Sequence, residues 1–235
     1  MLKNYQLEFT GKKLLSGDIY QFTFKMPPNE SLDFQAGQYL VLKVPKDQSF
    51  VSRLYSLASS PRDVNKIELL VEIIPGGLGS IYLDSLEIGQ KVDFMGPAGQ
   101  FIIKNPARKK TFLVTGTGIA PVRSMIFSGI ENYILYWGIR TYKDLYLFDE
   151  FKNTNIRICL SRENDLNAIL SEEDRNYFRL GRVDACLTKE TESIGDFDKT
   201  NTDYYICGGR TVVESLRLFL LSKDIPKEHI FFEKF

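Results

Sequence analysis

The chain has 235 residues, of which 43% are hydrophobic and 26% charged, so it can form one large domain or two small ones. Its 30 lysines and arginines balance its 30 aspartates and glutamates, which leaves no net charge to attract nucleic acid or an anionic membrane. The three cysteines, Cys159, Cys186 and Cys207, are far apart and form no CxxC pair, which argues against a metal centre or a disulfide framework.

The first residues of the chain contain no apolar core typical of a signal peptide, and no apolar run approaches the length of a membrane span. Separated free cysteines are typical of a reducing compartment. We therefore expect a cytoplasmic, monomeric protein that binds no metal.

Residues 1–104 alternate apolar and polar side chains in short runs, as β-strands do. The predicted strands lie at residues 5–9, 19–24, 39–44, 67–74 and 91–95. We expect one short helix over residues 80–86, with Ser80 as its N-cap. Strands at this spacing, separated by Gly, Pro and Asp, predict an antiparallel Greek-key β-barrel.

Residues 105–235 have a different pattern, in which apolar strand-like runs alternate with helical ones. The predicted strands lie at 112–114, 133–137, 156–160 and 203–207, and the predicted helices at 119–128, 143–151, 166–178 and 211–222. For the end of the chain, one interpretation is a last strand at 230–232 with Phe235 as loose apolar packing. This alternation predicts an α/β domain with a parallel sheet covered on both faces. We therefore place the domain boundary between residues 104 and 105.

The segment TFLVTGTGIAP joins a predicted strand to a predicted helix through a tight turn. The turn consists of Thr115, Gly116, Thr117 and Gly118, and Pro121 falls in the first helical turn, where its missing N–H costs nothing. Glycines let the backbone approach an anion, and the free N–H groups of a first helical turn face it. The segment predicts a phosphate-binding loop; the alternative is an ordinary strand–turn–helix corner.

The run Arg53, Leu54, Tyr55 and Ser56 brings a cation, an aromatic ring and a hydroxyl group into one short segment. An arginine can bind a phosphate through two hydrogen bonds, and a tyrosine can stack on a planar ligand. The serine adds a small donor. The alternative is an edge strand with a solvated Arg53 and a core Tyr55.

A second glycine-rich turn leads into the predicted short helix and consists of Gly76, Gly77, Leu78, Gly79 and Ser80. It predicts a second anion site by the same backbone physics, and its alternative is a flexible hairpin loop before a capped helix. Two such turns, in differently patterned halves of the chain, indicate two phosphate-bearing ligands.

Seven short motifs occur in one order along the chain: RLYSLAS, PGGLGS, GPAGQF, TGTGIAP, SRE, CGG and EKF. In this order the chain resembles the ferredoxin–NADP reductase family of flavoproteins over residues 5–235. The resemblance implies an FAD-binding barrel followed by a nucleotide-binding α/β domain, with FAD and NADP as cofactors.

The resemblance also implies roles for residues of the first domain. Arg53, Leu54, Tyr55 and Ser56 hold the flavin ring and the FAD pyrophosphate, with Tyr55 stacked on the ring and Ser56 near its N5 atom. The strand containing Leu70, Val71 and Glu72 runs beside the flavin. The turn of Gly77, Leu78, Gly79 and Ser80 caps the pyrophosphate.

In the second domain, the resemblance implies that Thr115, Gly116, Thr117, Gly118 and Pro121 receive the pyrophosphate of the nicotinamide dinucleotide. Cys207 and Gly208 flank the nicotinamide. Glu233 lies close to Ser56 and Cys207, and Phe235 shields the outer face of the flavin until the nicotinamide displaces it. The implied catalytic residues are Ser56, Cys207 and Glu233.

The choice between NADP and NAD depends on the residues near the adenosine ribose. Ser161 and Arg162 follow the third predicted strand of the second domain, as in NADP-using relatives, and Arg140 adds a second cation. Glu163 opposes a 2′-phosphate, because a carboxylate prefers a free ribose diol. We expect NADP, with NAD as the alternative; Arg140 is also compatible with a solvated loop.

The resemblance predicts hydride transfer between NADP(H) and flavin N5, followed by one-electron exchange with a separate carrier, ferredoxin or flavodoxin. Three alternatives stay open: an NAD(P)H–flavin reductase acting on free flavin, an electron-transfer reductase component of an oxygenase, and a regulatory subunit that keeps the fold without turnover.

Overall fold

The computed structural model describes residues 2–63, 65–168, 171–194 and 197–235. The chain forms two compact units: a first unit of Met1–Lys104 with Ala120–Ile130, and a second unit of Asn105–Ile119 with Glu131–Phe235. The chain therefore passes between the units three times, whereas the domain boundary at residues 104 and 105 stays a prediction. No helix within the described residues is both long and apolar enough to cross a membrane.

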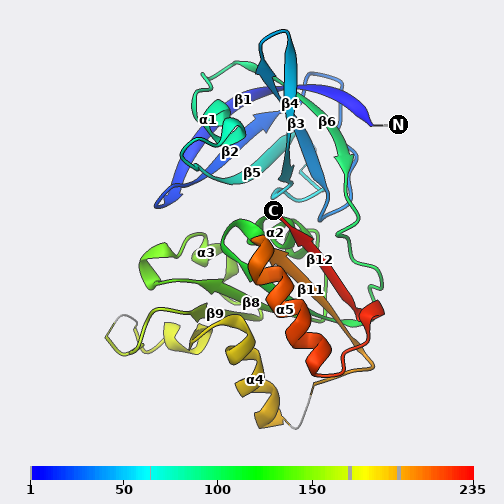
Figure 1. Cartoon of the computed structure of the whole chain (residues 1–235). Coiled ribbons are helices and arrows are strands. Elements are labelled where there is room, and N and C mark those ends of the chain that lie inside the picture. The colour runs from blue at the N-terminus through cyan, green and yellow to red at the C-terminus, as the bar shows by residue number, and fades with distance from the viewer. Residues whose placement is uncertain (1, 64, 169–170, 195–196) are drawn as a thin grey trace. The chain divides into compact units, whose positions relative to one another are not determined.

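The first unit is built on an antiparallel sheet of six strands in the order β4-β3-β6-β1-β2-β5 (Figure 1). The strands are β1 (Lys3–Ser16), β2 (Ile19–Lys25), β3 (Tyr39–Lys46), β4 (Ser49–Ser56), β5 (Lys66–Glu72) and β6 (Lys91–Ala98). The two edge strands meet just beyond β4, where Leu57 forms a β-bridge with Leu69 and the Ala58 N–H donates to the Glu68 carbonyl at 2.8 Å. This contact closes the sheet into the predicted barrel.

The barrel core consists of side chains that alternate along each strand and point inward. Phe24 on β2 and Phe94 on β6 are fully buried and meet edge to face, with ring centroids 5.4 Å apart. Leu69 and Val71 on β5 belong to the same buried cluster. Burying a side chain of this size contributes about 1.5–3 kcal/mol each.

The short helix α1 (Leu78–Asp84) begins two residues earlier than predicted. Its N-cap is Gly77, so the prediction that Ser80 caps the helix is wrong. The Ser80 hydroxyl is instead buried, where it accepts a hydrogen bond from the Ile74 N–H at 3.1 Å and lies 3.2 Å from the Gly77 carbonyl. It therefore fastens the loop before the helix.

The second unit is built on a parallel sheet of six strands in the order β10-β9-β8-β7-β11-β12. The strands are β7 (Lys109–Thr115), β8 (Tyr133–Ile139), β9 (Ile156–Leu160), β10 (Phe178–Leu180), β11 (Thr202–Gly208) and β12 (Ile230–Lys234). The strand order reverses at β7, and ligands of open parallel sheets bind at such a switch point, beyond the carboxyl ends of the strands.

Helices α4 (Val183–Ile194) and α5 (Arg210–Ser222) pack on the same buried cluster of the parallel sheet, through side chains such as Leu187 and Leu216. Helix α3 (Phe148–Phe151) lies against β8, where Phe151 contacts Trp137 with centroids 6.1 Å apart. Helix α2 (Ile119–Phe127) follows β7 along the chain, and all but its first residue belong to the first unit.

Two of the predicted helices need correction. The helix predicted at 143–151 is interrupted, because Leu147 adopts a left-handed φ of 55° that no continuous helix accommodates, so only a 3₁₀ turn and the four residues of α3 form. The helix predicted at 166–178 is wrong: its described part contains a 3₁₀ turn at Asp174–Tyr177, and Phe178 already pairs with Ile158 in the sheet. Residues 169 and 170 of that prediction lie outside the described residues.

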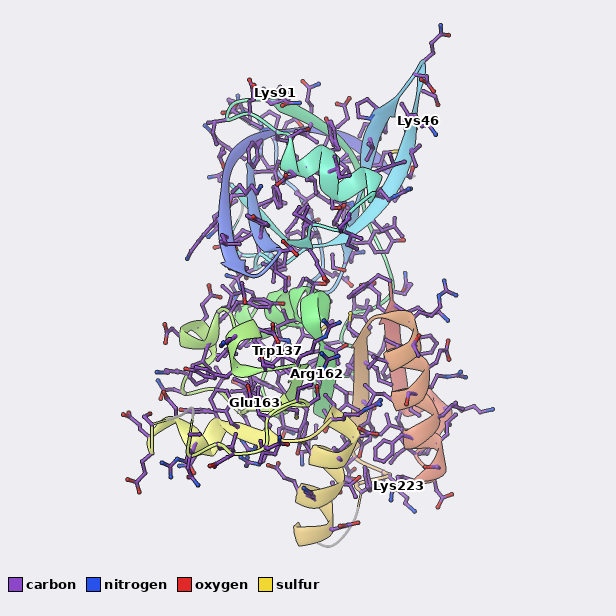
Figure 2. All side chains as sticks on the ribbon, turned by 60° about the vertical axis from the view of Figure 1, so that its left-hand side comes forward. Lys46, Lys91, Trp137, Arg162, Glu163 and Lys223 are labelled. Carbon is purple, nitrogen blue, oxygen red and sulfur yellow. The ribbon has the colours of Figure 1, made fainter. Side chains whose placement is uncertain are left out.

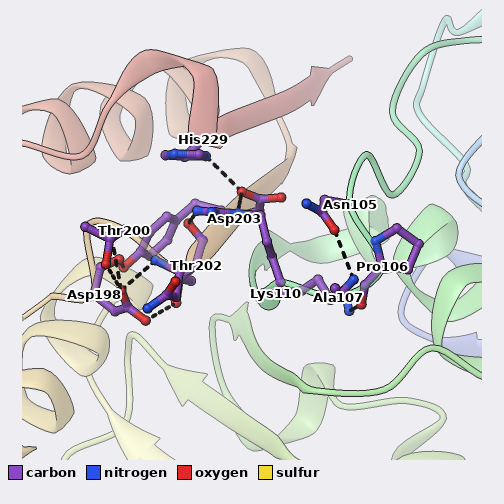
Figure 3. Close-up of polar contacts among 12 residues, drawn as sticks. Asn105, Pro106, Ala107, Lys110, Asp198, Thr200, Thr202, Asp203 and His229 are labelled. Carbon is purple, nitrogen blue, oxygen red and sulfur yellow. Dashed lines mark hydrogen bonds and ion pairs between the residues drawn. The ribbon is translucent and has the colours of Figure 1, made fainter.

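The opposite, N-terminal edge of the parallel sheet carries a buried polar network (Figure 3). Asp203 on β11 accepts from the Arg108 Nε at 2.6 Å and lies 3.0 Å from the Nδ1 atom of His229. The ammonium of Lys110, a residue only 1% exposed, donates to two backbone carbonyls, at 2.5 and 2.9 Å. This network lies at the end of the sheet away from the switch point and fastens the strand starts.

Candidate functional site

Residues 53–56 form the C-terminal half of β4, which is an edge strand of the barrel sheet. Arg53 and Tyr55 are two residues apart and therefore project from the same face of the strand. Arg53 is exposed and Tyr55 is half-buried against the barrel core, whereas Leu54 is 60% exposed and Ser56 is half-buried. The segment thus presents a cation and an aromatic ring side by side.

Gly79 in α1 packs against this pair of side chains. A Cβ atom on Gly79 would lie 2.5 Å from the Tyr55 hydroxyl and 2.8 Å from Cγ of Arg53, which is closer than real Cβ atoms approach. The fold therefore brings together the RLYS and GGLGS motifs that the sequence analysis assigned to one ligand. A cation, a ring and a glycine turn in contact fit a planar group attached to a pyrophosphate, as FAD is.

The hydroxyl of Tyr55 stays protonated over a wide pH range. Burial raises its pKa to about 12, and the charge of Arg53 opposes this rise only in part. A neutral phenol keeps both a ring face for stacking and a hydrogen-bond donor.

The three residues predicted on β5 differ in what they can offer a ligand. Leu70 and Glu72 lie on the outer face of the strand, and Glu72 is exposed. Val71 points into the barrel core, so a cofactor could contact only its main chain. In the α1 turn, Leu78 is 44% exposed while Ser80 is buried.

The predicted dinucleotide loop lies at the switch point of the parallel sheet. Thr115 ends β7, and Gly116–Gly118 form a 3₁₀ turn before α2. A Cβ atom on Gly118 would fall 2.4 Å from the Cys207 carbonyl oxygen. Gly208 has a φ of +152°, and a Cβ atom there would fall 2.3 Å from Oγ1 of Thr115. The loop and the CGG motif are therefore in contact, and this close approach requires glycine at both position 118 and position 208.

Two residues that the sequence analysis missed hold this loop in place. The Gly116 carbonyl accepts hydrogen bonds from the Trp137 indole N–H at 3.1 Å and from the Tyr146 hydroxyl at 3.0 Å. The two rings meet edge to face with centroids 4.8 Å apart, and Trp137, labelled in Figure 2, is fully buried. The only signal in the sequence is the position of the single tryptophan near the end of a strand.

Cys207 and Glu233 are cross-strand neighbours, because β11 and β12 pair in the register Cys207 to Glu233. Burial, and secondly the charge of Glu233, raises the pKa of the Cys207 thiol well above its ordinary value. The Phe235 N–H donates to the Gly208 carbonyl at 3.3 Å, which fastens the backbone beside the loop while the Phe235 ring stays 61% exposed.

Arg140 and Arg162 follow the neighbouring strands β8 and β9, and both are exposed. The Arg162 N–H donates to the Arg140 carbonyl at 2.8 Å, so the main chains of the two arginines are adjacent just beyond the ends of β8 and β9. Ser161 donates its hydroxyl to the Ile139 carbonyl at 3.2 Å. Glu163, shown with Arg162 in Figure 2, accepts from the Tyr142 N–H at 3.1 Å, so one of its oxygens is already engaged.

The predicted residues are divided between the units. Ser56 belongs to the first unit, and Cys207 and Glu233 to the second, so their proximity stays a prediction. Pro121 is buried within α2 in the first unit, whereas Gly118 belongs to the second. The predicted dinucleotide loop therefore contains one of the three points at which the chain passes from one unit to the other.

Comparison with known proteins identifies both halves of the chain. Residues 6–103 match the oxidoreductase FAD-binding domain family, and residues 112–217 match the oxidoreductase NAD-binding domain family. The chain is 30% identical over 94% of its length to the 2-halobenzoate 1,2-dioxygenase electron transfer component of Burkholderia cepacia, of which it spans 64%. It is 27% identical over 98% of its length to ferredoxin–NADP reductase B of Sorangium cellulosum, of which it spans 97%.

Among solved structures, a ferredoxin–NADP⁺ reductase from Neisseria gonorrhoeae with bound FAD and NADP has the same fold. The TM-score is 0.81 at 18% identity, covering 99% of this chain and 98% of the other. The first curated relatives are longer than this chain, which spans 64% and 65% of the first two.

Proposed function

Because the chain belongs to the ferredoxin–NADP reductase-like family of flavoprotein oxidoreductases, we propose that it transfers a hydride between NADP(H) and FAD and exchanges single electrons with a separate carrier protein. The observation that carries the proposal is the pair of glycine contacts, one in each unit. Gly79 lies against Arg53 and Tyr55, and Gly118 lies against Cys207.

The bound flavin and nicotinamide supply the redox chemistry, and the protein supplies binding and orientation. Arg53 binds phosphate, Tyr55 stacks its neutral ring, and Ser56 offers a hydroxyl donor beside them. The N–H groups at the start of α2 bind the dinucleotide pyrophosphate. Burial raises the pKa of the Cys207 thiol, which favours its protonated form, and we assign Cys207 to the wall of the nicotinamide pocket.

We further propose that the nucleotide is NADP in preference to NAD. Arg140 and Arg162 put two cations at the ends of adjacent strands, where an adenosine 2′-phosphate can accept hydrogen bonds from both. The carboxylate of Glu163 would favour NAD by accepting hydrogen bonds from a free ribose diol. One of its oxygens already accepts a hydrogen bond from the Tyr142 N–H, so it is less able to bind the diol.

The proposed carrier is a ferredoxin or a flavodoxin, and the second candidate is an oxygenase component. The Sorangium relative supports the first, since it is named a ferredoxin–NADP reductase, and the Burkholderia relative supports the second. We also propose functional domains of residues 1–104 and 105–235 and a monomeric protein. The separated free cysteines support a cytoplasmic location.

The test is made on purified, desalted protein. Retained FAD, with electrons passed from NADPH to added ferredoxin or flavodoxin, is the expected result. Colourless protein that reduces added riboflavin would point to a free-flavin reductase. FAD-loaded protein that no nicotinamide reduces would point to a regulatory subunit.

A further inference from the structure

Helix α2 begins at the dinucleotide loop, yet its side chains are fastened to the first unit. Arg123, in the middle of the helix, is 8% exposed. Its Nη1 atom donates to the Glu68 carboxylate at 2.8 Å and to the Ala58 carbonyl at 2.7 Å. A single buried guanidinium thus contacts both β5 and the segment that follows β4.

Glu68 is held from several sides as well. Its residue is 3% exposed, and its second carboxylate oxygen accepts from the Gln21 amide at 2.5 Å and from the Lys66 ammonium at 2.9 Å. Lys66 comes from β5 itself, whereas Arg123 joins this carboxylate to α2. Gln21 and Lys66 thus hold one carboxylate oxygen of Glu68, and Arg123 binds the other.

Serine side chains add two parallel connections. Ser124 donates its hydroxyl to the Ser59 carbonyl at 2.6 Å, and both residues are fully buried. Ser60 donates to the Phe127 carbonyl at 3.1 Å. The Ser59 hydroxyl in turn accepts from the Glu68 N–H at 3.2 Å, so residues 58–60, β5 and α2 form one hydrogen-bonded assembly.

The segments proposed to bind the two cofactors both lie next to this assembly along the chain. Ser59 comes three residues after Ser56, and Glu68 shares the outer face of β5 with Leu70, two residues on. Arg123 lies five residues after Gly118, on the helix that the dinucleotide loop begins. A shift of α2 on β5 therefore moves the start of that helix relative to the flavin strand.

We propose that Arg123 is a positioning residue for hydride transfer: through Glu68 and the Ala58 carbonyl it holds the helix of the dinucleotide loop against the strand beside the flavin. The inference rests on the proposed function. An arginine suits the role because its planar fork of donors binds two acceptors in fixed directions, whereas a lysine is a point charge on a flexible stem. A buried ion pair adds little net stability over apolar packing, so geometry is the better account of it.

The test replaces both charges together, because removing one partner leaves a buried unpaired charge that destabilises the fold. The double variant Arg123→Met with Glu68→Gln keeps a similar volume and leaves no buried lone charge, because the side chain of Lys66, the remaining cation, is 52% exposed. Lys66→Met is the matched control, because it removes a cation from the same carboxylate without touching α2. Each FAD-loaded protein is mixed anaerobically with saturating NADPH, and the rate of flavin bleaching is measured. The visible flavin spectrum and the Tm of each variant are recorded separately.

We expect flavin reduction to slow by about tenfold or more in the double variant, because a displacement of about 1 Å can cost about a hundredfold in rate. The FAD content should be retained, and the Lys66→Met protein should react at the wild-type rate. A folded double variant that is reduced as fast as wild type would overturn the inference, as would an equal loss in Lys66→Met.

A second variant covers the case in which the double variant loses FAD. Arg123→Lys keeps the charge and loses the fork, and we expect slower reduction at saturating NADPH with an unchanged flavin spectrum. A wild-type rate in Arg123→Lys would then refute the positioning role. Failure of the wild-type protein itself to be reduced would refute the proposed function instead, so the two failures are distinguishable.

Discussion

Gly118 lies directly against the carbonyl of Cys207: a Cβ atom on Gly118 would fall 2.4 Å from the oxygen and 2.7 Å from the carbonyl carbon. The end of β7 and the end of β11 thus meet through backbone alone. Backbone cannot move aside as a long side chain can, so only glycine permits this approach at the switch point of the sheet.

Gly118→Ala should therefore lower the stability of the protein and weaken NADP⁺ binding. Overpacking of this kind costs about 1–3 kcal/mol, and the loop must shift to relieve it. Chemical unfolding and NADP⁺ titration measure the two effects. Gly11→Ala is the control for stability, because a Cβ atom there meets nothing within 4 Å. Equal stability of the two variants would contradict the prediction.

Gly79→Ala should release FAD from a protein that stays folded. The added methyl group meets the Tyr55 hydroxyl and Cγ of Arg53, and these side chains can move, but they are the proposed flavin and phosphate contacts. We expect the FAD dissociation constant to rise about tenfold or more, as for a loss of about 1.4 kcal/mol. Flavin fluorescence on dilution measures it, and Gly11→Ala, with open space around the added Cβ, is the control.

Trp137→Phe should weaken NADP⁺ binding without affecting FAD. The variant keeps an aromatic ring but removes the indole N–H that donates to the Gly116 carbonyl at 3.1 Å. One such hydrogen bond is worth about 1 kcal/mol, or about fivefold in affinity, and Tyr146 still donates to the same oxygen. Calorimetric titration gives the affinity. In the wild type, the emission of this single tryptophan should change when NADP⁺ binds.

Arg162→Ala should weaken NADPH binding and leave NADH binding unchanged. A charge-assisted hydrogen bond contributes about 1.5–3 kcal/mol, so we expect about a ten- to hundredfold loss for NADPH alone. Arg140→Ala should act in the same direction. The half-buried Arg217 on α5 serves as the control position. An equal loss of both nucleotides would show that Arg162 supports the loop and does not read the 2′-phosphate.

Acid should remove part of the stability that Glu68 contributes. Burial opposes its ionisation, but the hydrogen bond from Lys66 and the charge of Arg123 outweigh burial and hold the pKa of Glu68 below its ordinary value of 4.5. The contribution is therefore complete above that ordinary value and is lost as the pH falls through the lower pKa of the folded state. The difference in unfolding free energy between wild type and Glu68→Gln should be largest near about pH 7 and shrink below about pH 4.5. A difference that grows on acidification would contradict this sign.

Local patterns predicted most of the fold. The alternation in residues 67–74 identifies β5, because every second side chain enters the barrel core. The helix predicted at 166–178 failed because polar residues such as Glu172 and Glu173 suit a helix as well as a turn, and the pairing of Phe178 with Ile158 decides between them. No local pattern reports such a contact between distant segments.

The same distinction holds for the candidate site. The glycine turns could be predicted because each turn is made of adjacent residues. The contacts that support them could not: Arg123 and Glu68 are 55 residues apart, and Trp137 and Gly116 are 21 apart. Nothing near Arg123 in the sequence distinguishes a buried, paired arginine from a solvated one.

We propose above all that this chain binds FAD and that the bound FAD accepts a hydride from a nicotinamide nucleotide. The most direct measurement is an anaerobic stopped-flow experiment in which FAD-loaded protein is mixed with NADPH or with NADH while the visible flavin absorbance is followed. We predict that the flavin bleaches completely in a single turnover. Bleaching should be faster with NADPH than with NADH, or should need a lower concentration of NADPH than of NADH. Retained, unbleached flavin with both nucleotides would contradict the account.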